Sequence, residues 1–181
     1  MIQAHIFAER SNTTAEDRDQ PVKEYYGGLF GQVVGLYDEL VALVESHLHV
    51  LSRVYGVAGG EERMSAVYTG VQDSVGSEEM AEQARAELLD AAADADVMII
   101  LLSSSVFQDT VEEVWDELVE AAKPESIWCL GAARSSLDRL DFEELEAKGC
   151  TVLTYQRVGV ARIGSDTREE LLEAVKRKGS Q

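Results

Sequence analysis

The chain has 181 residues, of which 45% are hydrophobic and 28% charged, which is typical of a globular protein and excludes a disordered one. Its net charge of −18 argues against a nucleic-acid partner, because phosphate contacts require clustered basic side chains. The length fits one domain over residues 1–181, and no linker or shift in composition marks a second one. The sequence shows neither a secretion signal nor an apolar stretch of membrane-spanning length, so we expect a cytoplasmic protein.

The basic residues of the chain are mostly arginines. Eleven arginines accompany only five lysines, and the weakly hydrated guanidinium suits salty surroundings better than an ammonium group. The acids are spread along the predicted helices, and high salt screens such an excess of like charge. The pattern indicates a halophilic archaeal or bacterial protein; the alternative is a cationic partner. Cys129 and Cys150 lie in apolar runs, which favours buried thiols in a reducing cytoplasm over a disulfide or a metal site.

The first half of the chain alternates apolar runs with polar segments. Apolar residues recur at helical spacing after Pro21, although four glycines weaken the start of that helix. In chain order we expect a strand at 2–8, a polar loop at 9–20, a long helix opened by Pro21, a strand at 48–54, a turn at 57–63 and a short strand at 64–68.

The second half holds the most apolar segment of the chain. The strand expected at 96–103, "DVMIILLS", contains a continuous apolar run, as required of a central parallel strand that is buried on both faces. The other elements expected here are a helix from Ser77 as N-cap to residue 93, a helix at 106–122 ended by Pro124, a strand at 126–130, a helix at 142–148 closed by Gly149, strands at 151–155 and 158–163, and a helix at 167–178 with a capping-box-like start.

Strand and helix therefore alternate throughout, at spacings that allow crossover connections. This alternation predicts an α/β protein with three layers, built on a mostly parallel, doubly wound (Rossmann-like) sheet of five to six strands.

Ligands of open α/β sheets bind beyond the carboxyl ends of the strands. The residues that follow the predicted strands are more polar and more cationic than the rest of the chain. The ligand contacts that we expect at this edge are Arg10, Arg53, Ser103, Ser104, Gly131, Arg134 and Ser135.

The stretch "GAARSS" at 131–136 is one candidate anion site. Gly131 permits a tight turn, Ser135 or Ser136 could cap a short helix with free amides, and Arg134 adds a forked donor. The ligand expected from this chemistry is an anionic small molecule such as a nucleotide, nucleoside or phosphosugar. The alternative is that the serines only cap helices and the arginines pair with surface acids. Neither a P-loop nor a G-x-G-x-x-G fingerprint is present, so no cofactor is assigned.

Weaker patterns yield no catalytic residue. His47 and His49 share one face of a strand, but no third metal ligand has clear spacing, so no metal site is assigned. A Ser-His-acid triad lacks its G-x-S-x-G elbow, and Glu9 beside Arg10 is better explained as structural than as a general base.

The segment "VKEYYGGLFGQVVGLYDEL", followed by "HLHVLSRVYGVAGGEE", resembles a group of small α/β domains. That group is similar to the YaaA peroxide-stress family and to accessory domains of queuosine and archaeosine tRNA modification. The resemblance covers the first third of the chain and implies an α/β fold. The matching positions are Tyr26, Leu29, Phe30, Leu51, Ser52, Tyr55 and Gly56.

Two classes of function remain open. The first is a protein that binds a small molecule at the sheet edge; if it is an enzyme, hydrolysis or transfer at a glycosidic or phosphate bond is the expected class. The second is a non-catalytic interaction protein that acts as a homo-oligomer or as a subunit of a complex. Its interface anchors would be aromatic side chains, which otherwise belong to the core: Tyr25, Tyr26, Phe30 and Trp115.

Overall fold

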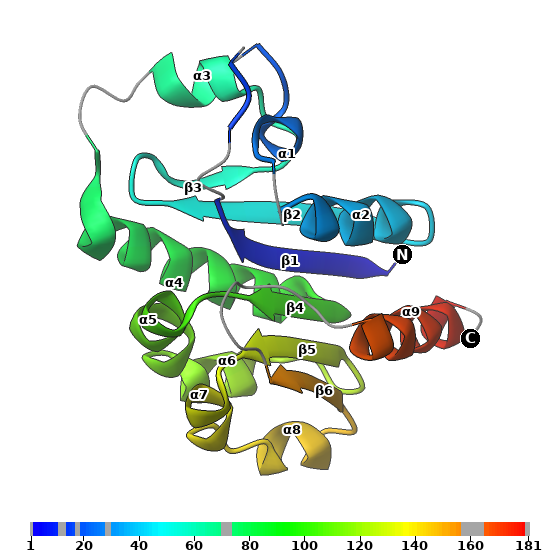
Figure 1. Ribbon diagram of the computed structural model, residues 1–181. Helices are drawn as coiled ribbons and strands as arrows, with labels where there is room; N and C mark the ends of the chain where they lie inside the picture. The colour runs from blue at the N-terminus through cyan, green and yellow to red at the C-terminus, as the bar shows by residue number, and fades with distance from the viewer. Residues whose placement is uncertain are drawn as a thin grey trace.

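The computed structural model describes residues 2–10, 14–16, 19–27, 30–69, 74–156 and 165–179. Within these residues one sheet has the strand order β3-β2-β1-β4-β5-β6 (Figure 1). The strands are β1 (Gln3–Glu9), β2 (Glu45–Ser52), β3 (Gly56–Gly59), β4 (Val97–Leu101), β5 (Ile127–Ala132) and β6 (Thr151–Gln156).

Five of these strands are parallel, and only β3 runs antiparallel, beside β2. β1 lies between β2 and β4, so the chain fills first one side of β1 and then the other. The parallel strands thus follow one of the two common doubly wound orders. The predicted fold class is confirmed.

Helices cover both faces of the sheet (Figure 1). One core joins β1 and β4 to α1, α2 and α9, and a second core joins the opposite face to α4, α6 and α8. The helices are α1 (Val22–Tyr25), α2 (Phe30–Val41), α3 (Met64–Thr69), α4 (Gly76–Asp94), α5 (Ser104–Phe107), the π-helical turn η1 (Gln108–Glu112), α6 (Trp115–Ala121), α7 (Arg134–Asp138), α8 (Glu143–Ala147) and α9 (Ser165–Gly179).

The central strand β4 shows why the sequence specifies three layers. All five of its side chains are buried. Val97, Ile99 and Leu101 belong to the core with α2 and α9, whereas Met98 and Ile100 point into the core with α4. Successive side chains of a strand point to opposite faces, so a strand covered on both faces must be apolar at every position.

Two predictions for the segment after β2 are wrong. The expected turn at 57–63 begins with strand β3, which pairs Val57 with Leu51 and Ala58 with Val50. The expected short strand at 64–68 is helix α3, and Met64 is fully buried. Periodicity alone does not separate a strand from a helix in so short an apolar run.

Three helix predictions also need correction. The helix after Pro21 is divided, because Tyr26 is extended (φ −92°, ψ 134°) and ends α1. The helix expected at 106–122 begins at Ser104 and contains the π-helical turn before α6. Ser77 lies inside α4, whose N-cap is Val75, and Gly76 takes the positive φ of the turn. The strand expected at 158–163 lies outside the described residues.

The aromatic residues considered as interface anchors are core residues. The exposed fractions are 7% for Tyr25, 4% for Tyr26, 5% for Phe30 and 6% for Trp115. The Tyr26 hydroxyl lies 2.8 Å from that of Tyr55, which ties α1 to the β2–β3 turn. These side chains therefore have almost no surface to offer a partner, and the prediction of interface anchors is wrong.

Both cysteines are free and buried, as predicted. Burial raises the pKa of Cys129 to about 12, so its thiol stays protonated at neutral pH. Among the described helices, none combines the length and the apolar character that a membrane span requires.

Candidate functional site

A cavity of about 210 Å³ lies at the carboxyl ends of β1, β2 and β4. The helices that follow β1 lie on one face of the sheet, whereas α4, which precedes β4, lies on the other. Such a switch point is where ligand crevices form in open α/β sheets. The lining residues come from the three strand ends and from two helices: Glu9, Arg10, Leu51, Ser52, Arg53, Met80, Ser103 and Val106.

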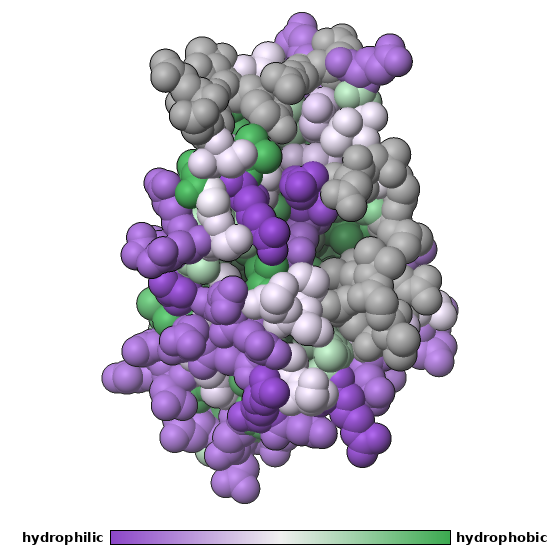
Figure 2. Space-filling model, turned by 60° about the vertical axis from the view of Figure 1, so that its left-hand side comes forward, coloured by the Kyte–Doolittle hydropathy of each residue, from purple (hydrophilic) through white to green (hydrophobic). Residues whose placement is uncertain are grey.

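Figure 2 turns the left-hand side of Figure 1, and with it this edge of the sheet, toward the viewer. Hydrophilic side chains dominate this face, and hydrophobic ones are visible only in small patches between them. Among the described residues, no broad apolar area is visible on this face.

Glu9 closes one side of the cavity. It ends β1, and its carboxylate accepts a hydrogen bond from the backbone N–H of Ser103, the residue just before α5. Of the expected anion contacts, Ser103 is thus already bonded through its amide to a carboxylate of the chain itself. A ligand that used this N–H would have to displace Glu9.

Two arginines stand at the rim. The backbone N–H of Arg10 donates to the Leu51 carbonyl at 3.0 Å, which extends the pairing of β1 with β2 up to the cavity. Both arginines are exposed. In the described part of the chain, the Arg53 guanidinium has no hydrogen bond and no ion pair. With the single charge of Glu9, the cavity lining carries a net positive charge in a protein whose net charge is −18.

The turn that carries Arg53 is held at both ends. Ser52 is 2% exposed, and its Oγ accepts a hydrogen bond from the Val54 N–H at 3.1 Å. Gly56 has φ +93°, and a Cβ at this position would lie 2.1 Å from Oε1 of Gln83, a residue of α4. The same oxygen accepts the Val57 N–H at 3.3 Å. The turn is therefore docked on α4, and Arg53 projects from a fixed backbone.

The other predicted contacts lie elsewhere. Gly131 does not form a turn: it is a buried residue inside β5, paired with Leu101 and Tyr155. The strand continues to Ala132, two residues beyond its predicted end, and this moves the turn to Ala133.

Helix α7 starts at Arg134, and neither Ser135 nor Ser136 caps it, because Ala133 is its N-cap and no side-chain cap is formed. The Arg134 side chain is 75% exposed and lies 3.7 Å from Asp138, one helical turn away. Ser135 is exposed, and Ser104 is the first residue of α5. None of Ser104, Gly131, Arg134 and Ser135 lines the cavity. The structure thus brings together only Arg10, Arg53 and Ser103 of the predicted set.

Sequence reasoning missed the apolar floor of the cavity. Leu51, Met80 and Val106 lie between the charged residues, and all three are buried. Met80 belongs to α4 and Val106 to α5. The rule that ligands lie beyond strand ends points to residues that follow strands, and it gives no signal for helix residues that reach the same place.

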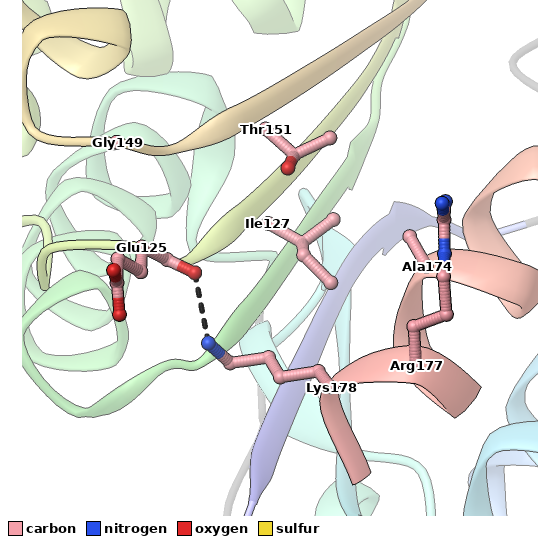
Figure 3. Close-up of a pocket in the computed structure, with 7 residues that line it drawn as sticks. All are labelled: Glu125, Ile127, Gly149, Thr151, Ala174, Arg177 and Lys178. Atoms are coloured by element: carbon pink, nitrogen blue, oxygen red, sulfur yellow. Dashed lines mark hydrogen bonds between the residues drawn. The ribbon is translucent and has the colours of Figure 1, made fainter. Parts of the chain in front are cut away.

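A second, larger cavity of about 340 Å³ lies at the opposite edge, beside the start of β5 and the end of α9 (Figure 3). The lysine of this cavity already has a hydrogen-bond partner within the chain. Lys178 Nζ donates to the Glu125 carbonyl at 2.8 Å, as the dashed line in Figure 3 marks. Glu125 is a non-glycine residue with φ +64°, so this bond supports an unusual backbone turn. The lining also contains the exposed Arg177, so we choose between the two cavities by position: ligands of open α/β sheets bind beyond the carboxyl ends of the strands, and we place the candidate site there.

No protein-family model matches the sequence, and a search of curated proteins finds no match either. Two solved structures align along nearly the whole chain, each with a TM-score of 0.41. One is a diflavin flavoprotein A3 from Nostoc sp., at 9% identity over 99% of this chain and 92% of that one. The other is a flavodoxin-like domain from a Synechococcus sp. protein, at 12% identity over 98% and 96% of the two chains.

Proposed function

We propose that this protein binds an anionic small molecule, such as a nucleotide or phosphosugar, in the cavity at the carboxyl ends of β1, β2 and β4. The observation that carries the proposal is the Arg53 guanidinium, which lines the cavity without a partner among the described residues. Although acids outnumber bases by 34 to 16 in this chain, no carboxylate of the described residues pairs with this guanidinium. A planar guanidinium suits two-pronged binding of a phosphate or carboxylate.

The remaining lining residues favour an organic anion over a bare ion. The Glu9 carboxylate accepts hydrogen bonds and would suit ligand hydroxyl or amino groups. Leu51 and Met80 close the cavity on its apolar side, and only 1% and 4% of their surfaces are exposed. A ligand with one anionic group and several hydrogen-bond donors uses both the arginine and the carboxylate of the lining.

The proposal is one of binding, and it names no reaction. Ser52 is a poor nucleophile candidate, because its hydroxyl accepts the Val54 N–H and none of the three histidines, all of which the structure describes, lines the cavity. We also propose a cytoplasmic location, which the two free, buried thiols support.

A thermal-shift screen with nucleotides, nucleosides, sugar phosphates and inorganic phosphate, in molar KCl, tests the proposal. A ligand at about 100 times its dissociation constant stabilises a protein by roughly 2.7 kcal/mol. We expect a shift for one ligand class in the wild type and its loss in Arg53→Gln. Arg134→Gln is the matched control, because Arg134 is also exposed and does not line the cavity. An equal shift in wild type and Arg53→Gln contradicts the assigned site.

A further inference from the structure

The three histidines of the chain form one cluster beneath α4. His5 is on β1, whereas His47 and His49 are on β2, and the rings of the two β2 histidines stack with that of His5 at centroid distances of 4.8 and 5.2 Å. The Phe7 ring packs in parallel on His49 at 4.2 Å. His5 is only 7% exposed. The cluster is separate from the candidate ligand cavity, since none of these residues lines it.

A hydrogen bond joins His5 to one carboxylate of α4, and a second α4 carboxylate lies close to His49. His5 Nε2 lies 2.9 Å from Asp94 Oδ2, and His5 Nδ1 lies 2.9 Å from His49 Nε2. His49 Nδ1 lies 3.5 Å from Glu87 Oε1. The result is a chain that runs from α4 through β1 and β2 and back to α4. We refer to Asp94, His5, His49 and Glu87 as the histidine chain.

The tautomers of the histidine chain follow from its partners. Asp94 is an acceptor when ionised, so His5 carries its proton on Nε2 and accepts at Nδ1. His49 must then donate from Nε2, and its Nδ1 is left with a lone pair facing Glu87. One added proton at His49 Nδ1 becomes a donor to Glu87 and leaves every other bond in place. A second added proton would put two N–H groups face to face across the 2.9 Å between the rings.

We propose that the histidine chain is a pH-responsive clamp that binds one proton and admits a second only when α4 separates from β1 and β2. The clamp is built from the packing of one helix on two strands, and it does not rest on the proposed ligand function.

The surroundings of the histidine chain support this proposal. Asp94 and Glu87 face it from α4, and on β2 the carboxylate of Glu45 lies 3.9 Å from His47. From β4 the neighbour of His5 is Met98, which is apolar and buried. Burial lowers the pKa of His5, although the hydrogen bond to Asp94 opposes this, and the two other histidines lower it further. In the described part of the chain, no three ligand-type side chains are arranged to hold a metal ion.

A histidine NMR titration of the full chain tests the clamp, because the cluster contains every histidine of the protein. Between pH 7.5 and pH 5, we expect the His5 and His49 rings to take up one proton between them, so that one ring stays neutral. At lower pH, the second proton should enter together with faster hydrogen exchange along α4. Two cationic rings beneath an α4 whose amides remain protected would overturn the proposal.

A pair of α4 variants adds a second readout. Glu87→Gln removes the carboxylate that faces the first proton on His49 Nδ1, and should move proton uptake by the pair to lower pH by roughly one unit. Glu87 is at the surface, with a side chain 42% exposed, so the variant should fold. Asp90→Asn, an exposed α4 position outside the cluster, should leave the titration unchanged. Equal titrations in the two variants would also contradict the proposal.

Discussion

The ligand cavity and the histidine chain are two polar regions that share three elements, β1, β2 and α4. In the cavity, Arg53 is exposed and has no partner among the described residues. In the histidine chain, both rings are bonded and stacked, and the side chains of His5 and His49 are only 9% and 16% exposed. The difference teaches how to separate the two roles: a charged group left unpaired at a cavity is available to a ligand, whereas a polar group that is satisfied internally holds elements together.

Phe7 divides the two regions, and its truncation should have the largest effect. Its side chain is fully buried between His5 and Glu9 on β1 and packs on His49. Phe7→Ala should lower the free energy of unfolding by about 3–5 kcal/mol, because it removes buried surface and leaves a void. Urea unfolding measures this loss. A loss below about 1 kcal/mol would mean that the Phe7 side chain is not tightly packed between the two regions.

The pH dependence of stability should come from the buried region. The pKa of His5 is lowered in the folded protein, so between this value and the ordinary value of 6.5 the unfolded chain binds more protons than the folded one. The contribution of His5 to the free energy of unfolding is therefore fully present above pH 6.5. As the pH is lowered from 6.5 to the lowered pKa, this contribution decreases by up to about 1.4 kcal/mol per pH unit for one proton.

Urea unfolding of wild type and His5→Gln at pH 7.5, 6 and 5 isolates this effect, because acids elsewhere contribute equally to both. The stability difference between them should shrink as the pH falls. A difference that stays constant would show that His5 titrates alike in the folded and unfolded states.

Ser52 tests whether the turn of Arg53 is preorganised. Ser52→Ala removes the acceptor of the Val54 N–H at a buried position, and should cost about 1 kcal/mol of stability. We also expect weaker ligand binding, although this substitution leaves the charge of the cavity unchanged. Unchanged affinity together with the stability loss would show that the turn need not be fixed.

Arg53 should show the smallest effect on stability and a large one on binding. Because its guanidinium is exposed and unpaired within the described residues, Arg53→Gln should change the unfolding free energy by less than about 0.5 kcal/mol. Chemical denaturation without ligand checks this value. A clear destabilisation would give Arg53 a structural role and remove the contrast between the two regions.

The fold was largely predictable, because its central strand has a strong pattern. Within the predicted strand at 96–103, every residue of β4 is apolar. A strand needs an apolar residue at every position only when both of its faces are covered. β3 was missed because two of its four residues are glycines and its pairing depends on the turn after Ser52. A glycine-rich segment carries too little side-chain pattern to separate a strand from a turn.

The candidate site was predictable only where it follows strands. Arg10, Arg53 and Ser103 lie directly after β1, β2 and β4, and the structure brings them together. The prediction of a turn at Gly131 was wrong because the end of the strand was placed two residues too early. Gly131 is therefore a paired residue inside β5. The partnership of His5 with His49 spans 44 positions and depends on strand order, which the sequence does not display.

Backbone amide NMR mapping with the best ligand from the screen tests the central claim most directly. The account predicts perturbations at Arg10, Arg53 and Ser103, with little change at 133–136 around α7. Perturbations centred on 133–136, with Arg10 and Arg53 unaffected, would contradict it.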